Sequence, residues 1–172
     1  ENRYELFHSR RIGKTPGILI PEEAVIIERP DATTILGAGK LLGETSGGTK
    51  YGVIESVTDE EFGTWESENG DKVSGMIEPR TNYFIGRLEQ PVFNTLSTVG
   101  FMVTDVRRNN IGYANVQGLD WKLKFMENAL TLKGQVVHSM KDNVSGKGAR
   151  INIGYNHPIW WDLNIVTGFT DD

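Results

Sequence analysis

Apolar and polar residues alternate with a period of two over much of the second half of the chain, and this pattern constrains the fold more than any other feature. In residues 113–125 one set of alternate positions becomes apolar while the other becomes charged: Leu119, Trp121, Leu123 and Phe125 against Asp120, Lys122 and Lys124. Successive side chains of a β-strand point to opposite faces, so this pattern predicts a strand with one apolar and one polar face. Helical periodicity does not fit it.

Further strands are predicted along the whole chain. Alternation recurs at residues 96–105, 150–156 and 159–169, and less regular runs at 33–44, 50–58 and 81–89 also read as strands. Turn-forming residues separate these runs, notably at 47–48, 69–71, 126–128, 141–148 and 156–158. Strands of about eleven residues with alternately short and longer connections are typical of an up-and-down β-barrel of an outer membrane. We therefore expect an all-β, antiparallel meander.

One domain of 172 residues is expected, forming part of a longer barrel wall. Residues 13–31 contain three prolines and six charged residues, and we interpret them as a long loop or a segment folded inward. If about eight strands form an open wall, its two sheet edges need partners, because lipid offers no hydrogen bonds. Further strands or another chain would have to close it.

Composition excludes several classes of protein. At 38% hydrophobic residues, and without an apolar run near the ~20 residues of a transmembrane helix, the chain does not resemble a helical membrane protein. A barrel needs lipid-facing side chains only at alternate positions. The formal charge of −5 and the lack of a basic run argue against nucleic acid as a partner. The chain has no Cys, which excludes disulfides and thiolate chemistry.

The alternation also assigns residues to faces. Those predicted to face lipid are Val99, Phe101, Leu119, Trp121, Leu123, Ile151, Ile153, Trp161, Leu163 and Ile165. Those predicted to face the lumen are Lys40, Lys122, Lys124, Arg150, Asn152, Asp162 and Asn164. Membrane lipid is thus the first expected partner.

Charged residues near the N-terminus and in the first half supply binding candidates. The adjacent Arg10 and Arg11 could bind phosphate or carboxylate through their forked donors. We favour a structural role instead, in which one arginine pairs with a carboxylate such as Glu55 or Glu78. A pair of acids suited to glycoside hydrolysis is the rival interpretation of the acidic residues. Most of them, however, crowd residues 59–68, which we interpret as a solvated acidic loop.

The remaining motifs do not indicate a catalytic or metal-binding site. Trp160, next to Trp161, could stack on a sugar together with Tyr155 and Trp121, but an aromatic girdle at the membrane interface is the preferred interpretation. The three histidines, His8, His138 and His157, do not have a metal-ligand spacing. No serine has a nucleophile-elbow pattern around it. We therefore predict no catalytic residues, no metal and no cofactor. These observations favour a protein that is not an enzyme.

Several longer motifs resemble a known family. They are, in order, residues 7–13 (FHSRRIG), 33–41 (TTILGAGKL), 54–58 (IESVT) and 78–87 (EPRTNYFIGR), the last being the most specific and containing Arg87 as a further binding candidate. In this order they resemble the bacterial domain-of-unknown-function family 5916. The likeness runs from about Leu6 to the C-terminal Asp172.

The resemblance implies a function only in outline. Proteins of that family typically join an N-terminal domain similar to family 9 carbohydrate-binding modules to a long domain resembling an outer-membrane barrel, and this chain is similar to the opening part of the latter. It implies an outer-membrane location and a link to surface glycan binding or uptake. Two alternatives remain open: a soluble β-sandwich or small barrel that binds carbohydrate, and a carbohydrate-active hydrolase.

Overall fold

The computed structural model describes residues 12–156 and 162–171, and within them the chain forms strands and no helices. Among those residues, accordingly, no helix is long and apolar enough to cross a membrane. The strands are β1 (Val25–Glu28), β2 (Ile35–Glu44), β3 (Lys50–Thr58), β4 (Glu61–Glu66), β5 (Lys72–Glu78), β6 (Thr81–Val92), β7 (Asn94–Arg108), β8 (Gly112–Phe125), β9 (Leu130–Lys141), β10 (Val144–Asn156) and β11 (Asp162–Asp171). The predicted all-β class is confirmed.

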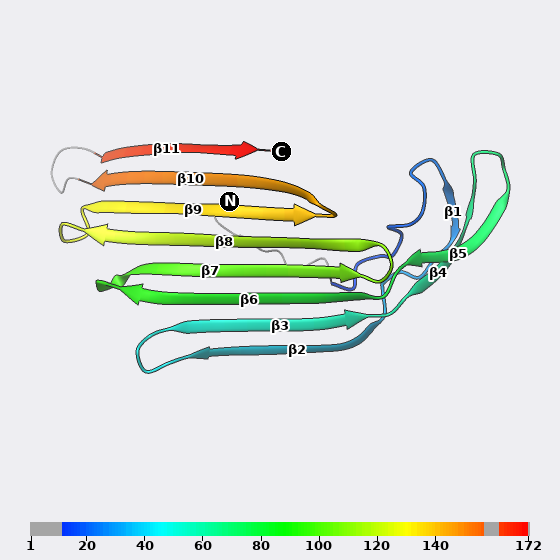
Figure 1. Cartoon of the computed structure of the whole chain (residues 1–172), viewed down its shortest axis with the longest axis horizontal. Coiled ribbons are helices and arrows are strands. Elements are labelled where there is room, and N and C mark those ends of the chain that lie inside the picture. Colours follow the sequence, from blue (N-terminus) through cyan, green and yellow to red (C-terminus); the bar gives the residue numbers. More distant parts are fainter. Residues whose placement is uncertain (1–11, 157–161, 172) are drawn as a thin grey trace. The chain divides into compact units, whose positions relative to one another are not determined.

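Eight of these strands form one antiparallel sheet in the order β11-β10-β9-β8-β7-β6-β3-β2 (Figure 1). Neighbours in the sheet are mostly neighbours in the chain, which is the meander expected from the short connections. The exception lies between β3 and β6, where the chain leaves the sheet to form β4 and β5 and then returns. In this order β2 and β11 are the edge strands.

The chain divides into two compact units. One contains the described residues up to Gly39, together with Ile54–Phe84 and Val106–Tyr113. The other contains Lys40–Val53, Ile85–Asp105 and the described residues from Ala114 onward.

In the first unit a small sheet in the order β1-β4-β5 covers a buried centre. Ile77 is fully buried, and Leu19 donates its backbone N–H to the carbonyl of Ile77 at 3.0 Å. Gly63 is required beside it, because a Cβ there would lie 2.9 Å from Ile77 Cδ1 and 2.8 Å from the carbonyl oxygen of Glu28. Within residues 13–31, the short strand β1 (Val25–Glu28) belongs to this sheet.

The acidic-loop interpretation of residues 59–68 was wrong. Glu61–Glu66 is β4, paired antiparallel with β5 through Phe62↔Met76, Thr64↔Ser74 and Trp65↔Val73. Phe62 and Trp65 are three residues apart in this strand, so this segment lacks the alternation with a period of two that identified other strands. The tight turn that joins the two strands places Gly70 at φ +82°, where glycine is favoured.

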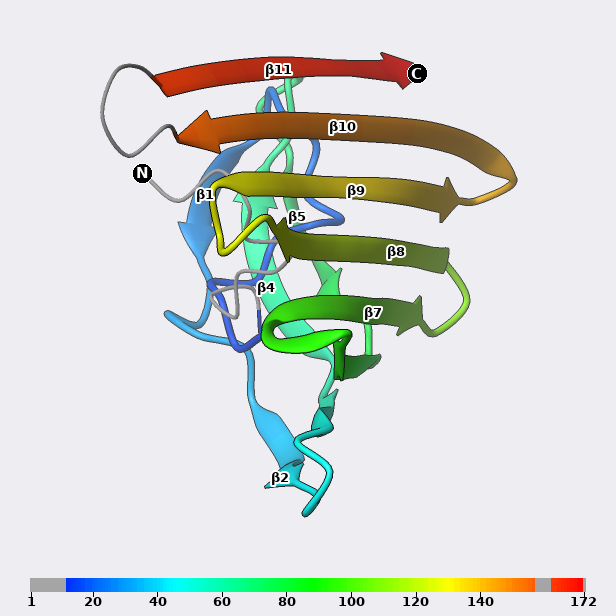
Figure 2. The ribbon, with the colours of Figure 1, turned by 90° about the vertical axis from the view of Figure 1, so that its left-hand side faces the viewer.

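The second unit contains a strand that the alternation analysis did not identify. β9 (Leu130–Lys141) lies between β8 and β10. The predicted long connection at residues 141–148 is also wrong, because only Asp142 and Asn143, both with positive φ, join β9 to β10 (Figure 2). A two-residue loop with positive φ at both positions matches the right-handed twist of the strands, and Asp and Asn tolerate that conformation.

Candidate functional site

The register of β8 to β11 gives this part of the sheet one apolar face. Leu123 pairs with Leu132, Leu132 with Ile153, and Ile153 with Ile165, so four apolar residues form a row across four strands. Three further rows are parallel to it. They are Phe125, Leu130, Tyr155 and Leu163; Trp121, Gly134, Ile151 and Thr167; and Leu119, Val136, Ala149 and Phe169.

Much of this apolar face is exposed. Relative exposure is 47% for Leu119, 50% for Ile165 and 62% for Phe169. Val99 and Phe101 of β7 are exposed as well. The predicted grouping of Leu119, Trp121, Leu123, Ile151, Ile153 and Ile165 on one face is confirmed by the register. Four of the six are exposed, while Trp121 and Leu123 are half-buried.

A polar row borders the apolar face. It follows the row of Leu119 and consists of Gln117, His138, Lys147 and Asp171, which pair in that order across β8, β9, β10 and β11. We call these four residues the boundary row. On its far side, the Asn115 side-chain amide donates a hydrogen bond to Asp105 at 3.1 Å. The change from apolar to polar therefore occurs between two adjacent rows.

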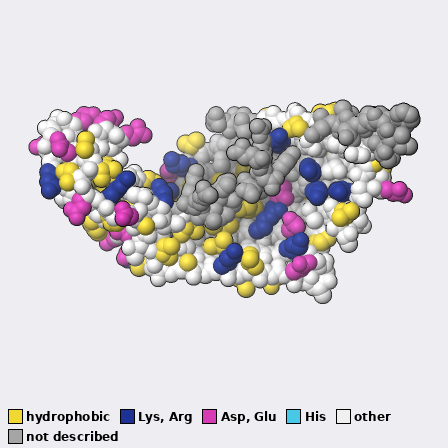
Figure 3. Space-filling view, turned by 180° about the vertical axis from the view of Figure 1, so that it is seen from behind, with side chains coloured by type: hydrophobic (Ala, Val, Ile, Leu, Met, Phe, Trp, Pro, Cys, Tyr) yellow, Lys and Arg dark blue, Asp and Glu magenta, His cyan; other side chains and the backbone are white. Residues whose placement is uncertain are grey.

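The opposite face is mainly polar. Lys122 pairs with Lys133, and Lys133 pairs with Asn152, while Gln135 pairs with both Asp120 and Arg150. A space-filling view of one side of the molecule shows Lys and Arg side chains interspersed with Asp and Glu side chains (Figure 3). The prediction that Lys122, Lys124, Arg150 and Asn152 share a face opposite the apolar residues is confirmed by the same register.

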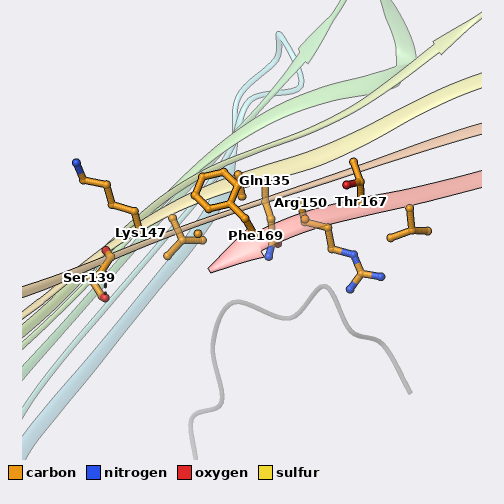
Figure 4. Close-up of a pocket in the computed structure, with 12 residues that line it drawn as sticks. Gln135, Ser139, Lys147, Arg150, Thr167 and Phe169 are labelled. Atoms are coloured by element: carbon orange, nitrogen blue, oxygen red, sulfur yellow. Dashed lines mark hydrogen bonds between the residues drawn. The ribbon is translucent and has the colours of Figure 1, made fainter. Parts of the chain in front are cut away.

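A groove of about 640 Å³ crosses β9, β10 and β11. Gln135 and Arg150 project from one side of the sheet there, and Lys147 and Phe169 from the other (Figure 4). The glycines Gly146, Gly148 and Gly168 leave the polar side without side chains at three lining positions. Gly168 also has no room for one, since a Cβ would lie 2.8 Å from the carbonyl oxygen of Ala149.

Arg87, a predicted binding residue, lies in a charge network within the second unit. Its guanidinium makes two hydrogen bonds to Asp120, one of them 2.8 Å from Nη2 to Oδ1, and a third of 3.5 Å to Glu89. Lys50 lies 3.9 Å from Glu89. Arg87 thereby links neighbouring parts of the sheet through its side chain, and Asp120 accepts hydrogen bonds from both of its terminal nitrogens.

The two predicted carboxylates have separate partners. Glu78 is almost fully buried, and its Oε2 accepts the backbone N–H groups of Gly17 and Ile18, both at 3.0 Å. Glu55 is exposed and accepts the side-chain amide of Asn82 at 2.8 Å. A carboxylate that satisfies two backbone donors is anchoring a loop, which gives no support to its use as a catalytic acid.

The other predicted site residues lie elsewhere. Arg10, Arg11 and Trp160 fall outside the described residues, and so does Trp161. Trp121 lies in an inner row of the apolar face, over Gly134, where an added Cβ would overlap its indole. Among residues 12–156 and 162–171, no cluster of three or more His, Asp or Glu side chains could hold a metal ion.

Sequence reasoning missed the partners of these residues. Asp120 was assigned to a polar face without a role, because 33 positions separate it from Arg87. The boundary row was missed because β9 was not identified. The alternation of Leu130, Leu132 and Val136 with Thr131 and Lys133 was the available signal.

Comparisons with known proteins give one match. No curated protein and no solved structure was found to match the chain. A family model described as a domain of unknown function, DUF5916, matches residues 2–163. Because that match covers nearly the whole chain, and because the motifs at residues 7–13, 33–41, 54–58 and 78–87 lie inside it, the chain belongs to the DUF5916 family.

Proposed function

We propose that this chain forms part of the wall of a β-barrel in a bacterial outer membrane, with its apolar face toward lipid and its polar face toward an aqueous interior. The observation that carries the proposal is the set of four largely apolar rows on one face of β8, β9, β10 and β11, many of whose side chains are exposed. Soluble proteins rarely expose continuous apolar patches larger than a few hundred Å², and larger ones usually mark contact surfaces.

The height of the apolar face supports a bilayer as its partner. Residues on one face of an antiparallel strand repeat every ~7 Å, so the first and last of four rows lie ~20 Å apart along the strands. At the ~40° tilt typical of membrane barrels this becomes ~16 Å between the outer rows, which fits within the ~25 Å apolar band of such proteins. The face thus suits a comparatively thin hydrocarbon layer.

The polar face supports the second part of the proposal, that this side of the sheet faces an aqueous interior. Lys122, Lys133 and Asn152 form a polar row directly behind the apolar one. Gln135 and Arg150 line the groove there, so an amide and a guanidinium group lie at its wall. Donors of this kind suit hydroxyl-rich solutes, so surface glycan binding or uptake is the role we assign to the interior.

Adjacent residues on opposite faces give a direct test. The chain has no Cys, so single cysteines at Leu123 and Lys122 can carry a fluorophore without background labelling. After folding into dilauroylphosphatidylcholine vesicles that contain a brominated phospholipid, the label at Leu123 should be strongly quenched and the label at Lys122 only weakly.

Two results would contradict the proposal. One is equal quenching at Leu123 and Lys122 in folded protein. The other is a cooperatively unfolding, monomeric chain in plain buffer without detergent, with the label at Leu123 shielded from water. That second result would favour the soluble β-sandwich alternative, because the apolar face would then have to be covered by the protein itself.

A further inference from the structure

A groove of about 360 Å³ crosses the line where the apolar face of β8 to β10 meets the boundary row. Its apolar part is lined by Phe101, Leu119, Val136 and Phe169, and its polar end by Gln117, His138 and Lys147. A cavity of this size lies within the ~300–1,000 Å³ range of small-molecule sites. The groove is therefore amphipathic along its length.

The floor of the groove is set by a small residue. Ala149 pairs with Val136 on one side and with Phe169 on the other, so it interrupts a row of larger apolar side chains. Phe169 is 62% exposed and lines the wall of the groove. An apolar chain lying against Ala149 would contact side chains from β8, β9 and β11.

The polar end carries donors suited to a phosphate. His138 pairs directly with Lys147 across β9 and β10, and with Gln117 across β8 and β9, so the three side chains adjoin on one face. On its other side, Lys147 pairs in register with Asp171 of β11. Gln117 donates its amide to Asn115 at 3.1 Å. Lys147 is exposed at the point where the apolar surface ends.

We infer that this groove binds one phospholipid of the membrane, with an acyl chain against Ala149 and the phosphate at His138 and Lys147. The inference rests on the proposed function and specifies a lipid-binding site on the same face. Charge complementarity and the step in polarity identify the occupant, since a phospholipid joins an anionic group to an apolar chain at the same boundary. Hydrogen bonds to charged groups are the strong ones in such sites.

The test measures retention of dimyristoylphosphatidylglycerol. The full chain, folded in detergent micelles with this lipid, is examined by native mass spectrometry for bound phospholipid. A His138→Gln, Lys147→Gln double variant should bind it about tenfold more weakly, as expected for the loss of charged hydrogen bonds. Ala149→Leu should also reduce retention, because it fills the floor while staying apolar. Lys122→Gln, on the opposite face, is the matched control and should retain lipid normally.

Distinct outcomes separate this inference from the proposed function. Unchanged retention in both the double variant and Ala149→Leu, or an equal loss in Lys122→Gln, would overturn the site. So would displacement of the lipid by an equal concentration of inorganic phosphate, which would indicate a phosphate site without an acyl groove. If the label at Leu123 still shows insertion into vesicles, only the lipid site has failed; loss of that signal in wild type would refute the proposed function as well.

Discussion

Arg87 of β6 reaches across β7 to make two hydrogen bonds with Asp120 of β8, and it can do so because Gly100 lies between them. A Cβ at Gly100 would overlap the guanidinium of Arg87. Arg87 and Asp120 are each about 30% exposed, so their charges are partly shielded from water. The pair therefore couples three strands through side chains, in addition to the backbone ladder.

Replacing Gly100 tests this arrangement. Gly100→Ala should displace the guanidinium and lower the free energy of unfolding by about 1–3 kcal/mol, the cost of losing charged hydrogen bonds. Urea unfolding of the folded protein measures it. Gly39→Ala is the matched control, because a Cβ there meets nothing within 4 Å. In an Asp120→Asn background the cost of Gly100→Ala should shrink, and an undiminished cost would show that Gly100 does not act through the ion pair.

Opposite faces of β8 should respond differently to charge. Leu123→Arg should cost about 2–4 kcal/mol of folding free energy in lipid vesicles, the penalty for a cation near the bilayer midplane. Lys122→Gln should be tolerated, since the neighbouring face is polar. Folding yields and denaturant midpoints in vesicles compare the two. Similar effects of both changes would refute the assigned faces.

Glu78 should anchor the segment that contains Gly17 and Ile18. Glu78→Ala leaves two backbone donors without their acceptor, and we expect a loss of about 1–3 kcal/mol together with faster amide exchange at Gly17 and Ile18. Hydrogen exchange followed by mass spectrometry resolves this segment. Glu68→Ala, at an exposed acid in the turn between β4 and β5, should change neither quantity. Protection that stays at the wild-type level in Glu78→Ala would contradict the anchoring role.

Acid should weaken the link between Asp59 and Arg80. The Arg80 guanidinium, 2.8 Å from Asp59, and the backbone N–H of Glu60 hold the pKa of Asp59 below its usual range. Because the folded-state pKa is lowered, the contribution to stability is present above the unfolded value of about 4 and is lost as pH falls below it. Both side chains are exposed, so the effect is small.

A comparison with Asp59→Asn isolates that contribution. The difference between the unfolding midpoints of wild type and Asp59→Asn should be measurable near pH 7 and should shrink as the pH falls through the lowered folded-state pKa of Asp59. Asp71→Asn, another exposed acid, provides the control for a general change of charge. A difference that persists unchanged at low pH would exclude the ion pair as its cause.

Strand prediction succeeded where alternation was strong and failed where charge or turn residues concealed it. β8 and β10 were found because apolar residues alternate with charged ones over several pairs. β4 was missed because acidic residues surround Phe62 and Trp65. The connection between β9 and β10 was placed too long, because Gly146 and Gly148 resemble turn residues but lie within β10.

The candidate site could be predicted only in part. Which residues share a face followed from the period of two within each strand. Which strands lie side by side, and which residues pair, did not, because the register depends on loop lengths and on contacts across the sheet. For that reason the pairing of His138 with Lys147, and the groove beside Ala149, were not visible before the structure.

The sequence by itself determined the all-β class, the antiparallel meander and the two-faced character of the strands, because alternation within a strand is a local property of the backbone. Only the tertiary structure decided that Arg87 binds Asp120 across Gly100, that Glu78 is buried under a loop, and that four apolar rows end at one polar boundary row. Those relationships join residues far apart in the chain, and they exist only once the strands have taken one register.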